Sequence, residues 1–222
     1  MLENLIVPVL NRYDLLQRML SSLDYPIAHL LIIDNGASAV EHSFELDVPE
    51  CVEHTTYLPM PANLGVAASW NLGIKSFPYA ERWFFGSNDV EFHPGALERL
   101  CGARSDEITL SGDFPFWQAF SVGYEAVKSL GLFDEGFFPA YFEDTDYLRR
   151  AEHFGVTVRK LDIPSHHDNS STIKSGPGLL DKNARTFASN NSYYNEKVAG
   201  EDFGAGSWDV YRRRLNGWEL DR

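Results

Sequence analysis

Short apolar runs alternate with helical segments in the first half of the chain, and this alternation constrains the fold more than any other feature. Residues 5–10 are apolar, and His29 leads into an apolar run at 30–33; each stretch is rich in branched side chains and long enough for a buried strand. Between them, apolar residues recur at helical spacing from Leu15 to Leu23. A repeated strand–helix–strand order is typical of parallel strands joined by helical crossovers. We therefore expect an α/β fold with a single Rossmann-like, mostly parallel sheet flanked by helices.

The same patterns locate the individual elements. Strands are predicted at residues 5–10, 29–33, 55–60, 83–85, 117–122 and 156–161. Helices are predicted at residues 15–23, 63–77, 125–130 and 143–154. Asp14 is a candidate N-cap for the first helix, and His93-Pro94-Gly95 marks a further helix start. The Ser-, Asn- and Gly-rich stretch after His167 indicates a flexible loop.

Composition and charge limit the class of protein. The chain has 222 residues, of which 44% are hydrophobic, and a formal net charge of −13. These values indicate a globular protein and argue against binding nucleic acid through a broadly basic face. Cys51 and Cys101 are far apart and lack metal-ligand spacing, so we expect two reduced thiols. No apolar run reaches the ~18 residues of a membrane helix, and no signal peptide is visible, which predicts a soluble, cytoplasmic protein.

Polar clusters follow three of the predicted strands at the point where each strand ends. These clusters are Asn11-Arg12, Asp34-Asn35 and Asn88-Asp89. Ligands of open parallel sheets bind in a crevice beyond the carboxyl ends of the strands. We therefore expect the three clusters to converge on one crevice, with the strand from Trp117 lining it.

Acidic and histidine residues near two predicted strand ends suggest a metal site. Asp89 and Glu91 are two residues apart, so on an extended segment both carboxylates can face one cation. Magnesium and manganese prefer such oxygens, and imidazole accepts manganese more readily than magnesium. His166 and His167 follow the strand at 156–161. The alternatives are a solvated acidic turn and two surface histidines.

Three carboxylates fall in the first turn of the helix predicted at 143–154. Glu143, Asp144 and Asp146 are favoured there by the helix dipole alone. They also follow an aromatic stretch at 137–142. Apolar surroundings would raise the pKa of one carboxyl and make it a usable general base. Both interpretations remain open on spacing alone.

Small residues open the helix predicted at 63–77. Gly65 and its small neighbours would let a ligand approach the backbone, where free N–H groups suit an anion or ribose hydroxyls. Small residues also permit close packing of a helix on a sheet, which is the alternative. Trp70 has the spacing of a core residue.

Taken in order, these motifs resemble the inverting nucleotide-sugar glycosyltransferases of family 2, and within them the bacterial rhamnosyltransferase-like members. The resemblance covers about residues 4–200 and implies the GT-A fold with a short C-terminal helical tail. It rests on Pro8-Val9-Leu10-Asn11-Arg12, Ile32-Ile33-Asp34-Asn35, Asn63-Leu64-Gly65 with Asn71, Ser87-Asn88-Asp89-Val90-Glu91, Gly131-Leu132-Phe133-Asp134-Glu135, Phe138 to Arg149, His166, and Tyr193-Tyr194 with Lys197 and Gly200.

The resemblance implies a donor site. Asp34 would contact the base or ribose, and Asn63, Gly65 and Asn71 would flank the nucleoside. The remaining implied nucleotide-sugar contacts are Pro8, Val9, Asn11, Arg12, Asn88 and Trp117. The donor would be a UDP-, dTDP- or GDP-linked sugar.

It also implies a metal and a base. Asp89 would hold Mn²⁺ or Mg²⁺ with Glu91 and with His166 or His167, of which we favour His166. Ser87 stands where the family's first metal-binding Asp often lies, so the strictness of the metal requirement is open. Asp144 would be the general base of a single inverting displacement, with Glu143 orienting it or the acceptor.

The resemblance further implies a division of the chain. Residues 1–172 would form the glycosyltransferase domain, with a nucleotide-binding half at about 1–92 and an acceptor and catalytic half at about 93–172. Residues 173–222 would form a flexible loop and a helical tail.

Two alternatives to a glycosyltransferase remain. One is a nucleotidyltransferase, which usually has a Gly-rich phosphate loop that residues 10–16 lack, and the other is a non-catalytic nucleotide- or sugar-binding module.

The acceptor hydroxyl is not specified by these motifs. A glycan or small molecule is favoured over a modified DNA base. Arg212, Arg213 and Arg214 are the place where the tail would contact DNA or an anionic membrane. An ordinary amphipathic helix packed on the body is the favoured interpretation of this tail.

Overall fold

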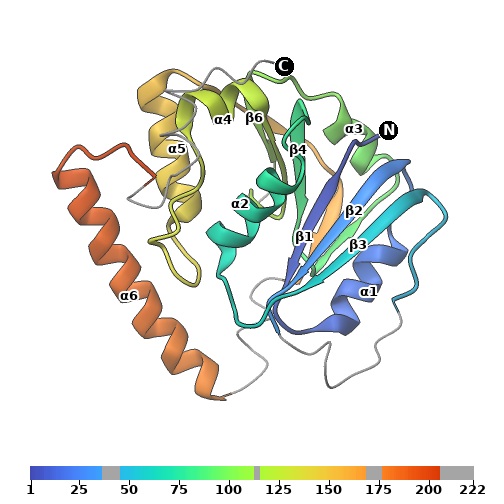
Figure 1. The fold of residues 1–222 in the computed structure, drawn as a ribbon, viewed down its shortest axis with the longest axis horizontal. Helices are drawn as coiled ribbons and strands as arrows, with labels where there is room; N and C mark the ends of the chain where they lie inside the picture. The colour runs from blue at the N-terminus through green and yellow to red at the C-terminus, as the bar shows by residue number, and fades with distance from the viewer. Residues whose placement is uncertain (37–45, 113–115, 169–176, 206–222) are drawn as a thin grey trace.

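One seven-stranded sheet forms the centre of the molecule (Figure 1). The computed structural model describes residues 1–36, 46–112, 116–168 and 177–205, without the side chains of 177–183. The strand order within this part of the chain is β3-β2-β1-β4-β7-β6-β8. The strands are β1 (Leu5–Val9), β2 (Ile27–Asp34), β3 (Val52–Pro59), β4 (Arg82–Gly86), β6 (Glu107–Ser111), β7 (Ala119–Gly123) and β8 (Thr157–Leu161). Two short strands, β5 (Val90–Phe92) and β9 (Ser165–His167), pair with each other outside this sheet.

Among the described strands of the seven-stranded sheet, only β7 runs against its neighbours. It pairs antiparallel with both β4 and β6, whereas the pairs among β3, β2, β1 and β4, and the pair of β6 with β8, are parallel. The carboxyl ends of β1, β2 and β3 therefore meet at one edge, at the lower centre of Figure 1. The expected α/β fold with a mostly parallel sheet is confirmed.

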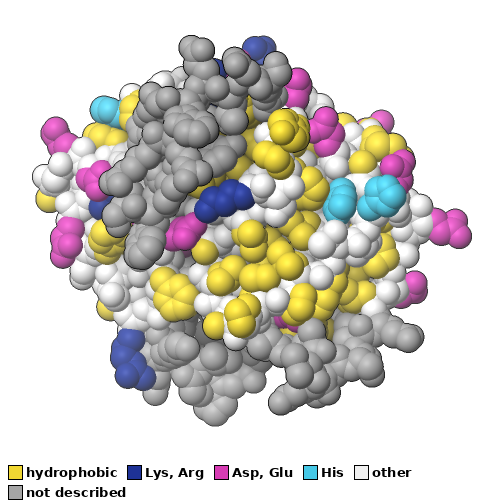
Figure 2. Space-filling model, viewed as in Figure 1, with side chains coloured by type: hydrophobic (Ala, Val, Ile, Leu, Met, Phe, Trp, Pro, Cys, Tyr) yellow, Lys and Arg dark blue, Asp and Glu magenta, His cyan; other side chains and the backbone are white. Residues whose placement is uncertain are grey.

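Helices cover both faces of the sheet. Helices α1 (Tyr13–Ser21) and α3 (Ala96–Cys101) bury Leu16, Met19 and Leu97 against one face. Helices α2 (Val66–Ser76), α4 (Tyr124–Leu130) and α5 (Glu143–Phe154) bury apolar residues, such as Trp70, against the other. Hydrophobic side chains also gather at the surface over α2 (Figure 2). Helix α6 (Pro177–Ala199) stands apart from the sheet (Figure 1).

Several local expectations are corrected. The N-cap of α1 is Arg12 in a left-handed conformation, and Asp14 pairs with the Arg12 guanidinium instead of capping the helix. Helix α2 begins at Val66 because Gly65, with φ of 85°, ends the preceding turn. Strand β7 begins at Ala119, not at Trp117. Cys51 and Cys101 are free thiols, as expected.

Within the described ranges, no helix combines the length and the apolar character that a membrane span requires. Residues 169–176 of the loop predicted after His167 lie outside those ranges, and so do the three arginines at 212–214.

Candidate active site

The polar clusters at the strand ends come together. The Asn35 backbone N–H donates to the carbonyl of Val9 at 2.7 Å, which joins the ends of β2 and β1. The Asn88 amide donates to the carbonyl of Asn11 at 3.2 Å. Because segments far apart in the sequence meet here, the edge of the sheet carries a shared polar cluster, in which Asn35 and Asn88 are buried.

Asp34 is fully buried at the end of β2, and its carboxylate is held by neighbours. It accepts hydrogen bonds from the hydroxyls of Tyr13 and Tyr57 and from the Gly36 N–H at 2.8 Å. Burial, and then the hydrogen bond to Asp34, raises the pKa of Tyr57 and keeps its hydroxyl a donor. A direct contact of Asp34 with a nucleotide therefore requires one of these donors to move.

The start of α2 is closed by internal hydrogen bonds. The N–H of Leu64 donates to the Asn35 side chain, that of Gly65 to the Asn63 side chain, and that of Val66 to the carbonyl of Pro139. Contrary to the expectation, these three N–H groups are therefore not free for an anion. A Cβ at Gly65 would lie 2.9 Å from the Pro139 carbonyl oxygen, so this glycine serves close packing.

Three other residues of the implied donor site are bonded to or packed against other parts of the protein. Asn71 is buried, and its side-chain nitrogen donates to the Phe133 carbonyl and to the Glu135 carboxylate. Its side-chain oxygen accepts from the Phe133 N–H. Val9 is 1% exposed and belongs to the core beside α1. Trp117 is half-buried and stacks on Trp70, with ring centroids 5.8 Å apart.

The remaining implied donor contacts are less enclosed. Pro8 is half-buried within β1, and Asn11 and Arg12 are half-buried in the turn that follows this strand. Asn63 is also half-buried and is fixed through its bond to Gly65.

Asp89 pairs with His167. The His167 Nε2 lies 2.9 Å from a carboxylate oxygen of Asp89, and both side chains are mostly buried. His166, which the sequence favoured, is instead 59% exposed and 3.5 Å from Asp168. Adjacent residues of a strand point to opposite faces, so only one of the two histidines in β9 can face Asp89.

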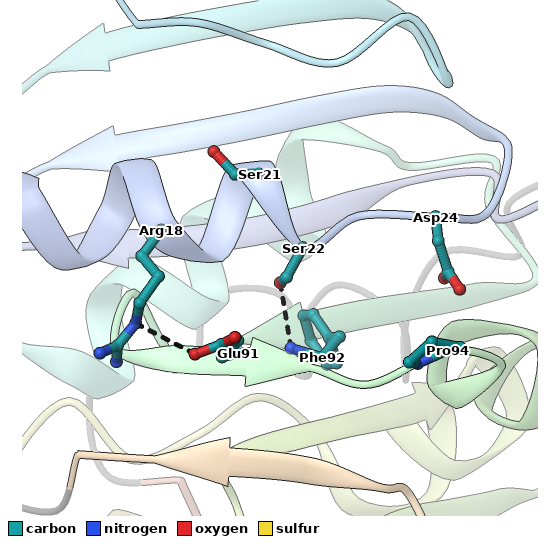
Figure 3. A pocket seen from close by; sticks show the side chains of 7 residues that line it. All are labelled: Arg18, Ser21, Ser22, Asp24, Glu91, Phe92 and Pro94. Carbon is teal, nitrogen blue, oxygen red and sulfur yellow. Dashed lines mark hydrogen bonds and ion pairs between the residues drawn. The ribbon is translucent and has the colours of Figure 1, made fainter.

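Glu91 is turned away from this pair. It lies in a pocket of about 310 Å³ between α1 and β5, where its carboxylate is 3.5 Å from Arg18 (Figure 3). Arg18 also pairs with Asp168, a contact that the sequence reasoning missed. The expected sharing of one cation by Asp89 and Glu91 is not seen, and no group of three or more His, Cys, Asp or Glu residues able to hold a metal occurs in the described part of the chain. The pocket is lined by Arg18, Ser21, Ser22, Asp24, Glu91, Phe92 and Pro94.

Glu143 and Asp144 begin α5 and differ in their surroundings. Glu143 is 6% exposed, and within the described residues its Oε2 has no hydrogen-bond partner. Burial, and then the charge of Asp144, raises the pKa of Glu143 to about 8. Asp144 is half-buried and accepts from the N–H of Thr145 at 2.7 Å. Burial also raises the pKa of Asp144, which makes its carboxylate a stronger base.

One segment brings these carboxyl groups to the strand ends. The Pro139 carbonyl accepts from the N–H of Val66 at the start of α2. Two residues earlier, the N–H of Leu64 donates to the Asn35 side chain at the end of β2. Asp144 follows Pro139 by only five residues. Asp146, the third acid of the cluster, is instead fully buried and paired with Arg150 at 2.9 Å.

The protonation of Glu143 predicts a pH-dependent stability. Its folded pKa lies above its ordinary value, so the folded state binds more protons and this group's stabilisation falls as pH rises from about 4.5 to 8. The slope from one such carboxyl is at most about 1.4 kcal/mol per pH unit. We expect Glu143→Gln to remove this decline, measured by urea unfolding at pH 5 and pH 8.

The exposed Glu152 on the same helix provides the control, and Glu152→Gln should keep the wild-type pH dependence. If Glu143→Gln and the wild type give parallel curves, Glu143 is not protonated in the folded protein.

Known proteins of the same architecture were found only among solved structures. No family model matches the chain, and no curated protein has a similar sequence. S. aureus TarS aligns with a TM-score of 0.54 and 13% identity over 74% of this chain. A structure of TarS 1–349 in complex with UDP aligns with a TM-score of 0.51 and 14% identity, over 74% of this chain and 59% of that one.

A third similar structure is that of Drosophila β1,4-galactosyltransferase 7 in complex with manganese, UDP-Gal and xylobiose. It aligns with a TM-score of 0.51 and 12% identity over 78% of this chain and 73% of that one. This chain spans only 36% of the first TarS structure. These likenesses show that the chain has the GT-A fold of these glycosyltransferases.

Proposed function

We propose that this protein is an inverting glycosyltransferase that moves a sugar from a nucleoside diphosphate to an acceptor hydroxyl. The position of Asp144 carries the proposal. This half-buried carboxylate with a raised pKa begins a helix, on a segment bonded to the strand ends where open α/β sheets bind ligands. The GT-A fold supports it, because the similar structures include complexes with UDP and UDP-Gal.

Asp144 acts as the general base. It takes the proton of the acceptor hydroxyl while that oxygen bonds to the anomeric carbon of the donor sugar. The bond from this carbon to the diphosphate oxygen breaks on the opposite side, so one displacement inverts the anomeric configuration. Glu143, protonated at neutral pH, orients the acceptor or Asp144 with its O–H and adds no second negative charge beside the base.

Asp89 and His167 are the residues that would hold a divalent cation. The Asp89 carboxylate oxygen and the His167 Nε2 lie 2.9 Å apart, so both atoms can face one ion. Mn²⁺ or Mg²⁺ needs only one or two protein ligands when phosphate oxygens complete the site, so this pair fits. When bound, the ion supplies positive charge for the diphosphate leaving group.

The acceptor in this proposal is a glycan or a sugar-like small molecule. Phe138 is 52% exposed on the segment that leads to Asp144, and hydrophobic side chains gather on the face over α2 (Figure 2). Apolar and aromatic side chains with a few polar groups are typical of small-molecule sites. A sugar ring presents both an apolar face and hydroxyls to such a surface.

Nucleotide binding tests the proposal most directly. We expect one of UDP, GDP or dTDP to raise the Tm in the presence of Mn²⁺, because a ligand at 100 times its Kd adds about 2.7 kcal/mol. EDTA should reduce the shift. No shift with any of the three would overturn the proposal, and a shift with nucleoside triphosphates alone would favour a nucleotidyltransferase.

Two histidine variants test the metal pair in the same assay. We expect His167→Ala to weaken the Mn²⁺-dependent part of the shift by at least about tenfold in metal affinity, since even outer-shell partners are worth that much. The neighbouring and exposed His166 is the matched control, and His166→Ala should leave the shift intact. A larger effect of His166→Ala would reverse the assignment.

A further inference from the structure

Helix α6 contacts the body along one stripe of side chains. Asn190, Tyr193, Tyr194 and Lys197 are the buried or half-buried residues of this stripe, while Asn191 and Asn195 between them are exposed. Their partners include Asp134, Phe137, Ala140, Tyr141 and Phe142. These partners all belong to the segment 134–142, which joins α4 to the start of α5 (Figure 1).

Asn190 holds the last turn before the candidate base. Its amide nitrogen donates to the carbonyls of Ala140 at 2.8 Å and Tyr141 at 3.2 Å. Tyr141 and Phe142 have φ of 81° and 73°, a left-handed conformation that aromatic residues rarely adopt. Such conformations persist only where neighbouring contacts hold them. Phe142 is also the N-cap residue of α5, and its carbonyl accepts the Asp146 N–H at 2.8 Å.

Lys197 ties the two ends of the same segment together. Its ammonium group lies 2.5 Å from Asp134 and 3.1 Å from Asp146, and donates to the Gly204 carbonyl at 2.7 Å. Asp134 begins the segment, and Asp146 lies two residues beyond Asp144. Both carboxylates are fully buried, and Lys197 is 3% exposed. The charge of Lys197 therefore holds the loop after α4, through Asp134, next to the first turn of α5, through Asp146.

We propose that Asn190 and Lys197 are positioning residues. Through them α6 holds the turn at 140–142 and so fixes the orientation of Glu143 and Asp144. This inference rests on the proposed function, because it assigns the catalytic role to Asp144. Neither side chain touches the reacting groups: Asn190 acts through the backbone of the turn, and Lys197 acts through the carboxylates of Asp134 and Asp146.

The sharpest test changes one side-chain group of Asn190. Asn190→Asp keeps the shape but replaces the donor by an oxygen facing two carbonyls. We expect the amide of Asp146, followed by hydrogen–deuterium exchange, to exchange about tenfold faster, because two hydrogen bonds are lost. The kcat for transfer should fall at least as much, while the Kd for the nucleotide stays unchanged.

Asn191→Asp is the matched control, because it makes the same change on the exposed side of the same helix. It should alter neither exchange nor kcat. Lys197→Arg, which keeps the charge, should retain more activity than Lys197→Met.

Unchanged exchange at residues 140–146 in Asn190→Asp would overturn the positioning role, and so would faster exchange without loss of kcat. A wild-type chain that transfers no sugar from any donor would overturn the proposed function instead. The exchange comparison would then still decide whether α6 holds the turn.

Discussion

Asp144→Asn is expected to lower the rate of sugar transfer about 10²–10⁴-fold, the usual contribution of a positioned general base. Asparagine keeps the size of the side chain and can still accept from Thr145, so α5 and its first turn remain intact. What is lost is the ability to take a proton from the acceptor hydroxyl. The measurement is kcat with a saturating donor, together with the Kd for the nucleotide, which should not change.

The control for Asp144→Asn is Glu152→Gln, which removes an exposed carboxylate from the same helix. This variant should transfer sugar at the wild-type rate. Near-wild-type kcat in Asp144→Asn would exclude Asp144 as the base and direct attention to Glu143. The pH–rate profile separates the two, because a Glu143 base would work only above its pKa of about 8.

The first half of the fold was predictable because its signals are local. The runs at 29–33 and 83–85 are apolar and branched or aromatic, and both lie inside observed strands. Strand β6 was missed although Glu107–Ser111 alternates polar and apolar residues, which is typical of a half-buried strand; the pattern does not reveal that both of its faces are buried. Its polar side chains are satisfied by distant partners, such as Arg159 for Glu107, which no local pattern reveals.

The location of the candidate site was predictable, but the contacts that its side chains make with one another were less so. The convergence of the strand-end clusters follows from parallel topology alone. Which histidine faces Asp89 depends on the pairing of β9 with β5, and the commitment of Asn71 to the 133–135 segment depends on tertiary packing. A sequence pattern identifies the side chains that can do chemistry, but not which of them the fold has already used.

The charges behind the candidate base illustrate the same point. Asp146 looked like one of three acids at a helix start, yet it belongs to a buried group with Arg150, Lys197 and Asp134. These four side chains are at most 3% exposed, and a third base, Arg149, lies 3.7 Å from Asp146 with 15% of its side chain exposed. This group joins α5, α6 and the loop after α4, so it links the stability of the fold to the position of Asp144.

Arg150→Met is expected to destabilise the protein by about 3–5 kcal/mol, because the buried Asp146 loses its shortest ion pair and keeps only Lys197 at 3.1 Å and Arg149 at 3.7 Å. Arg150 is fully buried and donates to Asp146 and to the carbonyls of Leu130 and Leu132, each at 2.9 Å. Methionine fills much of the same volume but satisfies none of these acceptors. For a chain of this size the loss corresponds to a fall in Tm of about 10 °C, measured by thermal and urea unfolding.

Arg99→Met is the control, because it removes an exposed arginine from an ion pair and so separates the effect of burial from the effect of losing the charge. Arg99 pairs with Asp162 at 2.7 Å, but their side chains are 53% and 77% exposed, so losing this pair should cost only about 0–1 kcal/mol. If Arg150→Met costs no more than Arg99→Met, the buried pair of Arg150 with Asp146 adds no more to stability than an exposed ion pair. The buried charges would then not hold α5 in place, and the aim of Asp144 would depend on the backbone bonds of residues 139–142 alone.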